Sequence, residues 1–179
     1  MSSSRDARRR DCRHGFNIGR AAGGARRSLP HVVDLLVQLG YPARPEALSG
    51  VLDALLGDAR YAVLVAEHPG DGLVAMIALS SRPVLRLQGW LGTIEELVVK
   101  RGMRDRGIGD RMVQHAKGLA TERGWMRLET SVARTRESSR RGFLLSRGFA
   151  ADECVTYRWG MLEGRQQAPW VQEPRSEMV

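Results

Sequence analysis

The stretch that decides the fold is IEELVVKRGMRDRGIG, residues 94–109. It opens with an apolar run typical of a buried β-strand and ends with two glycines. An amphipathic segment follows, in which Ile108, Met112 and Leu119 recur at helical spacing. The first N–H groups of a helix lack intrahelical acceptors and carry partial positive charge, so a turn at this point can hold an anion.

The side chains of this turn suit a phosphate. Gly107 and Gly109 have no Cβ where the phosphate would approach, and Arg104 and Arg106 add charge-assisted donors. The predicted phosphate-binding turn comprises Arg104, Asp105, Arg106, Gly107, Ile108 and Gly109. A Gly-x-Gly turn is by itself weak evidence, since tight turns precede helices in many folds. The sequence is neither a Walker loop nor a six-residue dinucleotide fingerprint.

Strand and helix patterns alternate on both sides of this stretch. Apolar runs predict strands at 16–21, 61–67, 73–79, 91–99, 127–132 and 155–161. Helical spacing and capping residues predict helices at 28–40 (with Ser28 as N-cap), 45–57, 107–122 and 137–146. This order predicts an α/β domain with a mixed, largely antiparallel central sheet flanked by helices, not a doubly wound parallel sheet.

Charge is concentrated at the start of the chain. Of the 179 residues, the first 27 carry eight arginines against two aspartates and hence most of the net charge of +8. We expect a disordered basic leader at 1–15, one domain at 16–162 and a C-terminal tail at 163–179. Nucleic acid is an unlikely partner, because no aromatic residues for base stacking interleave with these arginines.

Other features exclude several classes of protein. Cys12 and Cys154 form neither a metal spacing nor a disulfide framework, and the four histidines are scattered, so no metal site is expected. No apolar run approaches the roughly 18 residues of a membrane span, and there is no secretory h-region. We expect a cytoplasmic protein without a membrane partner.

Three motifs resemble the GNAT family of N-acetyltransferases. The Arg-x-x-Gly-x-Gly turn at 104–109, after a strand ending in Leu-Val-Val, resembles the family's acyl-CoA-binding motif. Residues 140–149, RRGFLLSRGF, resemble its second signature, a helix closing on Gly-Phe. Residues 35–42, LLVQLGYP, resemble the first helix and turn of many bacterial members. The resemblance covers about residues 16–162.

The resemblance implies a binding site for acetyl-CoA. The backbone of Leu97 and Val99 would pair with the pantetheine arm, and the N–H of Leu97 or Val98 would stabilise the oxyanion. The N–H groups of the turn would bind the pyrophosphate, and the helix at 137–146, with Phe143, would flank the cofactor. The family's splayed strand pair, here 97–99 against 129–131, would hold the acyl-CoA between its strands.

The resemblance also implies direct attack of a primary amine on the thioester in a ternary complex. An amine with a pKa of about 10 must first lose a proton, so a carboxylate base is useful. The candidates, in order of preference, are Glu95, Glu129 and Glu96, and each is equally well explained as a solvated or ion-paired carboxylate. Glu95 and Glu96 lie on opposite strand faces unless a bulge intervenes.

Two departures from the family concern the helix at 137–146. Leu144 stands where many members carry the tyrosine that protonates the thiolate, and Glu137 stands where an asparagine is common. Ser146 and Tyr157 are the nearest hydroxyls in sequence. Tyr41, in the loop after the first helix, is a candidate for contact with the acceptor.

The favoured function is acetyl transfer to an amine of a small molecule or a protein, by a monomer or homodimer. A catalytically weak acyl-CoA sensor is the alternative, and a nucleic-acid-associated protein using the basic leader is a third reading.

Overall fold

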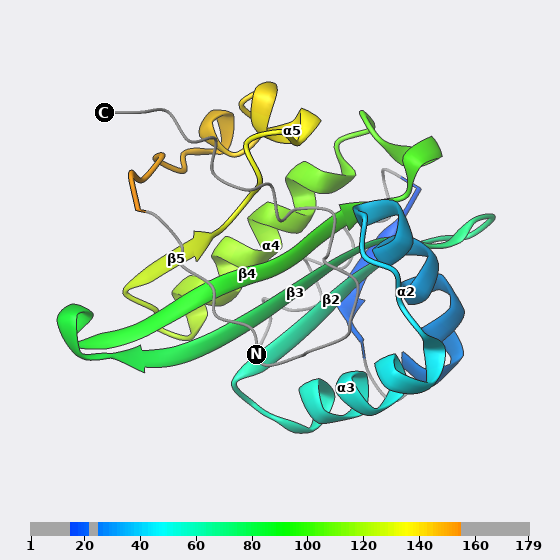
Figure 1. Cartoon of the computed structure of the whole chain (residues 1–179), viewed down its shortest axis with the longest axis horizontal. Coiled ribbons are helices and arrows are strands. Elements are labelled where there is room, and N and C mark those ends of the chain that lie inside the picture. Colours follow the sequence, from blue (N-terminus) through cyan, green and yellow to red (C-terminus); the bar gives the residue numbers. More distant parts are fainter. Residues whose placement is uncertain (1–14, 22–24, 155–179) are drawn as a thin grey trace, which may run out of the picture. The chain divides into compact units, whose positions relative to one another are not determined.

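The computed structural model describes residues 15–21 and 25–154 (Figure 1). One compact unit ends at Phe149, and residues 150–154 of the next unit form neither helix nor strand. The strands are β1 (Asn17–Arg20), β2 (Tyr61–His68), β3 (Gly72–Val84), β4 (Gly89–Val99) and β5 (Arg127–Thr130). The helices are α2 (Ala25–Leu39), α3 (Pro45–Gly57), α4 (Ile108–Glu122) and the short α5 (Glu137–Arg140). Three 3-10 turns are η2 (Leu85–Leu87), η3 (Arg101–Met103) and η4 (Leu145–Arg147).

The described strands form one sheet in the order β1-β2-β3-β4-β5. Neighbours from β1 to β4 are antiparallel, whereas β4 and β5 are parallel. Short turns can join antiparallel strands, but parallel strands need a crossover, which α4 supplies here. The predicted mixed, largely antiparallel sheet flanked by helices is therefore confirmed.

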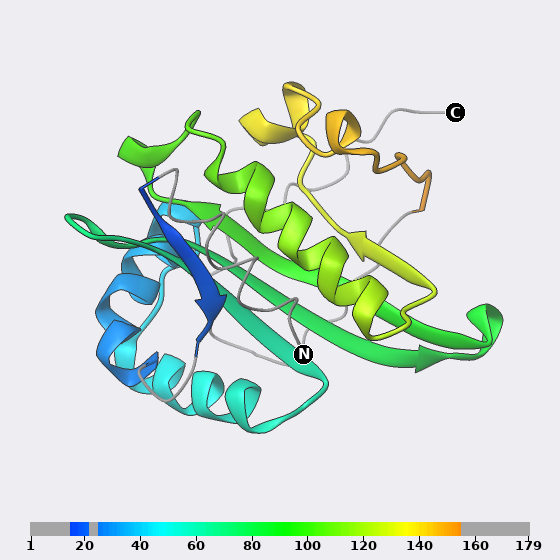
Figure 2. The ribbon, with the colours of Figure 1, turned by 180° about the vertical axis from the view of Figure 1, so that it is seen from behind.

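The helices cover opposite faces of the sheet. Figure 1 shows α2 and α3 on one face, and Figure 2 shows α4 on the other. Leu35 of α2 and Leu52 of α3 pack with Val63 and other residues of β2 and β3 in one core. Ile108 and Met112 of α4 belong to the second core, on the far face. Because β2 and β3 are covered on both faces, their sequences are almost continuously apolar.

Several element boundaries differ from the prediction. The β3–β4 hairpin is longer than the apolar runs indicated, because polar residues such as Ser80 and Arg82 continue the ladder toward solvent. Helix α2 begins at Ala25, so the prediction of Ser28 as its N-cap was wrong. The strand predicted at 155–161 lies outside the described residues.

The helix predicted at 137–146 was also wrong, because α5 ends at Arg140. Gly142 adopts φ +63°, with its N–H bonded to Ser139 O and the N–H of Phe143 bonded to Ser138 O. This is a Schellman closure, the usual way in which a left-handed glycine ends a helix. The same pair of bonds recurs at Gly148 and Phe149. The repeated Arg-Gly-Phe in RRGFLLSRGF therefore produces two closures, not one helix.

Gly92 gives the fold a testable constraint. A Cβ built on this β4 residue would lie 2.0 Å from the ring of Trp125. We expect Gly92→Ala to destabilise the protein by about 1–3 kcal/mol, because the ring or the strand must move. Denaturant unfolding measures this, with Gly19→Ala as the control, since a Cβ at Gly19 meets nothing within 4 Å. An unchanged unfolding midpoint in Gly92→Ala would contradict the packing described here.

Candidate functional site

A β-bulge interrupts β4 in the middle of the sheet. Ala78 pairs with Glu96 while the next residue, Leu79, pairs with Ile94, so Glu95 is an extra residue opposite β3. A bulge shifts the alternation of side chains by one position. Accordingly Ile94 and Leu97, three residues apart, both pack into the core beneath α4.

The bulge places Glu95 and Glu96 on the same face of the sheet. Glu96 shares the face of Val98, which packs in the core beneath α2 and α3. Glu95 accepts a hydrogen bond from Ser80 Oγ, which lies on this face in register with Thr93. The sequence predicts opposite faces for Glu95 and Glu96 unless a bulge intervenes. The bulge is present, so both carboxylates lie on one face.

The third candidate carboxylate belongs to the same face. Glu129 of β5 pairs with Thr93 of β4, and its neighbour Leu128 packs toward α4 on the opposite face. Figure 1 shows that α2 and α3 do not extend over β5 on this side, and α2 covers β4 only near its Val98 end. Among the described side chains, none forms an ion pair with Glu95, Glu96 or Glu129.

The carboxyl of Glu96 is electrostatically distinct. Burial raises its pKa, and the negative charge of Glu95 raises that pKa further. Both effects disfavour the ionised form, so Glu96 holds a proton more readily than an exposed glutamate.

β4 and β5 separate at the bulge. Their parallel ladder runs from Leu91 and Arg127 to Ile94 and Thr130, where Thr130 Oγ1 also donates to Ile94 O at 2.9 Å. Beyond this point, residues 96–99 of β4 pair with β3 on one side only, within the described part of the chain. Backbone groups on the other side are therefore available for a ligand.

The turn at 104–109 follows directly from this strand. Arg104 Nε donates to Val99 O at 3.2 Å, which ties the turn to the end of β4. Gly107 is the N-cap of α4 at φ +75°, and no side chain caps the helix. A Cβ at Gly107 would meet nothing within 4 Å, so the space before the first turn of α4 is open.

The segment after α5 packs against the start of α4. A Cβ on Gly109 would lie 3.2 Å from Phe143 Cζ, so the glycine makes room for that ring. Arg147 lies 3.8 Å from the Phe143 ring centroid, and its Nε is 2.7 Å from Asp110 Oδ1. Asp105, at φ +60°, forms an ion pair with Arg141 at 3.3 Å. Both acids beside the turn are thus paired with arginines.

Two residues that sequence reasoning missed fix the end of α2. Arg136 donates from Nη2 to Leu39 O at 3.0 Å and to the Tyr41 hydroxyl at 3.4 Å. The side-chain oxygen of Gln38 accepts the N–H of Arg101 at 2.7 Å. Tyr41 is thereby held between α2 and the start of α5. No local sequence pattern predicts these contacts, which span 63 to 97 residues.

The sequence profile described as the Acetyltransferase (GNAT) family matches residues 29–149, which is more than half of the chain. The chain belongs to the GNAT acetyltransferase family. None of the curated proteins compared with it matches significantly. The profile covers the bulged strand, the glycine turn and α4, and it ends at Phe149, the second Schellman closure of the Arg-Gly-Phe repeat.

Solved structures share this GNAT fold. A transcriptional regulator from Bacillus halodurans C-125 is 24% identical, with a TM-score of 0.69 over 80% of this chain and 99% of its own. An aminoglycoside acetyltransferase from an uncultured soil metagenomic sample, in complex with sisomicin, is 19% identical, with a TM-score of 0.66 over 84% and 99%. A ribosomal-protein-alanine N-acetyltransferase from Brucella melitensis biovar Abortus 2308 is 21% identical, with a TM-score of 0.63 over 81% and 99%.

Two further observations bound the chemistry of the described residues. None of their helices has the length and apolar character needed to cross a bilayer. No three of their His, Cys, Asp or Glu side chains are grouped so as to hold a metal ion.

Proposed function

We propose that this chain transfers the acetyl group of acetyl-CoA to a primary amine of a small molecule or protein by direct attack in a ternary complex. The observation that carries this is the separation of β4 from β5 after Ile94, beside the open turn at Gly107. An exposed strand edge next to an uncapped helix start suits a ligand with an amide-containing arm and a diphosphate.

The residues present fit coenzyme A. The unpaired edge of β4 at Leu97 and Val99 would bind the pantetheine arm, with Val98 between them. The N–H groups from Arg104 to Gly109 would bind the diphosphate, and the ion pair of Asp105 with Arg141 would reduce its repulsion of that group. Phe143, seated against Gly109, would flank the cofactor. Bound acetyl-CoA supplies the activated acyl group, and a β4 N–H would donate to the thioester oxygen.

We propose Glu96 as the general base. It adjoins the unpaired edge, and its raised pKa makes it a stronger proton acceptor than an ordinary carboxylate. Glu95, fixed by Ser80, would act through its charge by keeping that pKa high. Glu129 adds a third carboxylate on the same face, so the site would favour a cationic acceptor. We propose Tyr41 as a further contact for that acceptor.

No tyrosine is available to protonate the thiolate at the position that the family uses, because Leu144 stands there. Ser146 Oγ donates to Phe143 O at 3.0 Å. Tyr157 lies outside the described residues. We propose that coenzyme A leaves as a thiolate protonated by solvent. An acyl-CoA sensor would instead bind the cofactor and show no turnover with any amine.

Gly107→Ala tests the cofactor site. A Cβ there would project into the open space before α4, so we expect the affinity for coenzyme A to fall at least about tenfold, as measured by calorimetry. Gly124→Ala is the matched control. Gly124 also has positive φ (+65°) and open surroundings, but it lies beyond the C-terminal end of α4. Both variants carry roughly 1 kcal/mol of backbone strain. Equal affinities in the two would contradict the assignment.

The pH dependence of the rate tests the base. A glutamate base works as the carboxylate, so activity rises as pH rises through its pKa. Removing the charge of Glu95 lowers the pKa of Glu96, so Glu95→Gln should move the acidic limb of the kcat profile to lower pH. Glu96→Gln should lower kcat by about 10²–10⁴-fold and remove that limb.

Glu129→Gln is the control for this series. It removes the same charge from the same face, but from β5 and not from the bulged segment of β4. Ionisation of the acceptor is common to all variants and cancels in the comparison. A large loss of kcat in Glu95→Gln or Glu129→Gln, with Glu96→Gln still active, would show that the base is a different carboxylate.

A further inference from the structure

A second pocket lies at the opposite end of α4 from the glycine turn. It has a volume of about 240 Å³ and is lined by Ala59, Arg60, Ser81, Trp90, Arg123 and Trp125. Arg123 is the C-cap of α4, and Gly107 is its N-cap. The helix between them has 15 residues and so measures about 22 Å. The pocket is therefore separate from the proposed acetyl-transfer site.

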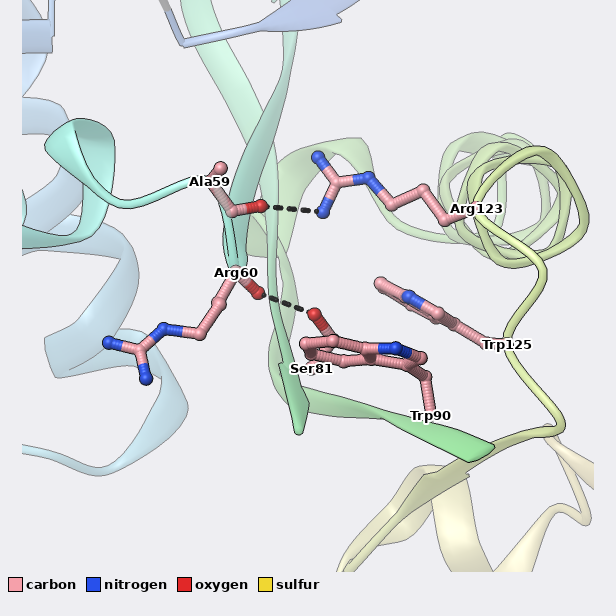
Figure 3. Close-up of a pocket in the computed structure, with 6 residues that line it drawn as sticks. All are labelled: Ala59, Arg60, Ser81, Trp90, Arg123 and Trp125. Atoms are coloured by element: carbon pink, nitrogen blue, oxygen red, sulfur yellow. Dashed lines mark hydrogen bonds between the residues drawn. The ribbon is translucent and has the colours of Figure 1, made fainter. Parts of the chain in front are cut away.

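Two indole rings form the apolar part of this pocket. The ring of Trp125 lies directly over Gly92, where any Cβ would come within 2.0 Å of it. A glycine inside a strand normally weakens it, so Gly92 is there to let the ring approach the backbone. Trp90 is 42% exposed, which is unusual for so large an apolar side chain. Figure 3 shows both indoles beside Ser81.

The polar groups around the indoles offer mainly hydrogen-bond donors to a ligand. Two carbonyl groups are already engaged, since Arg123 Nη1 donates to Ala59 O and Ser81 Oγ donates to Arg60 O, both at 3.0 Å (Figure 3). The guanidinium of Arg123 has further N–H groups. Within the described residues, neither indole N–H has a hydrogen-bond partner. A ligand that carries a hydrogen-bond acceptor would therefore complement these N–H groups.

The local charge is also positive. Burial lowers the pKa of Arg123, and the nearby positive charge of Arg20 lowers it further, against the opposite effect of Glu122. Asp58 is held by the bidentate contact of Arg60, whose side chain points away from the indoles in Figure 3. An anion beside Arg123 would relieve its repulsion with Arg20.

We propose that this pocket binds a small aromatic carboxylate, with its ring against Trp90 and Trp125 and its carboxylate on Arg123. Pockets for drug-sized ligands measure about 300–1,000 Å³, so this one fits a single ring system. Aromatic rings stack on indoles, and a guanidinium binds a carboxylate through charge-assisted hydrogen bonds.

Fluorine NMR with 4-fluorobenzoate on the full chain tests the proposal, with neutral 4-fluorobenzamide as the isosteric control. We expect saturable binding of the carboxylate in the millimolar range or below, and weaker binding of the amide. Arg123→Gln should weaken the binding of 4-fluorobenzoate about tenfold or more, and so should Trp90→Ala, which changes an exposed side chain. Arg86→Gln, with the same charge change at an exposed position outside the pocket, should leave binding unchanged.

Saturating coenzyme A should not displace the probe, because the two sites lie at opposite ends of α4. Thermal melts identify any variant that fails to fold, and the two pocket variants provide independent readouts. The proposal is overturned if the wild type shows no saturable binding, if the amide binds equally well, if coenzyme A displaces the probe, or if both folded pocket variants bind like the wild type.

Discussion

The β-bulge at Glu95 is the constraint on which the rest of the site depends. One extra residue in β4 reverses the alternation of the strand, so Leu97 turns toward α4 while Glu95 and Glu96 share the opposite face. The ladder with β5 ends at the adjacent pair, Ile94 and Thr130. The same short segment therefore gathers the carboxylates and frees the strand edge.

Helix α4 places the glycine turn next to the bulged strand. Its N-terminus stands beside the freed edge because Arg104 anchors the turn to Val99 O. Phe143 packs against Gly109 of that turn, and Arg141 and Arg147 form ion pairs with Asp105 and Asp110. The C-terminus of α4 carries Arg123 to the other end of the sheet, where the tryptophan pocket lies. One rigid element thus separates two chemically different surfaces.

The sequence predicted what local patterns encode. Apolar spacing located β2, β3, β4 and α4, because those elements bury continuous apolar faces. It misplaced the end of the helix at 137–146, since the left-handed Gly142 was not recognised as a stop. The bulge and the Arg136 contacts depend on pairing between residues distant in sequence, so no local pattern announces them. For the same reason, the sequence alone could not decide whether Glu95 and Glu96 share a face, because the answer depends on the bulge.

Hydrogen–deuterium exchange of the whole chain, with and without coenzyme A, tests the central claim most directly. We expect protection of the backbone N–H groups at 97–99 and 104–110 on binding, because the unpaired edge of β4 and the start of α4 would hold the ligand. The start of β5 and the C-terminal end of α4 should exchange at unchanged rates. Protection confined to other segments, or none at saturating coenzyme A, would contradict it.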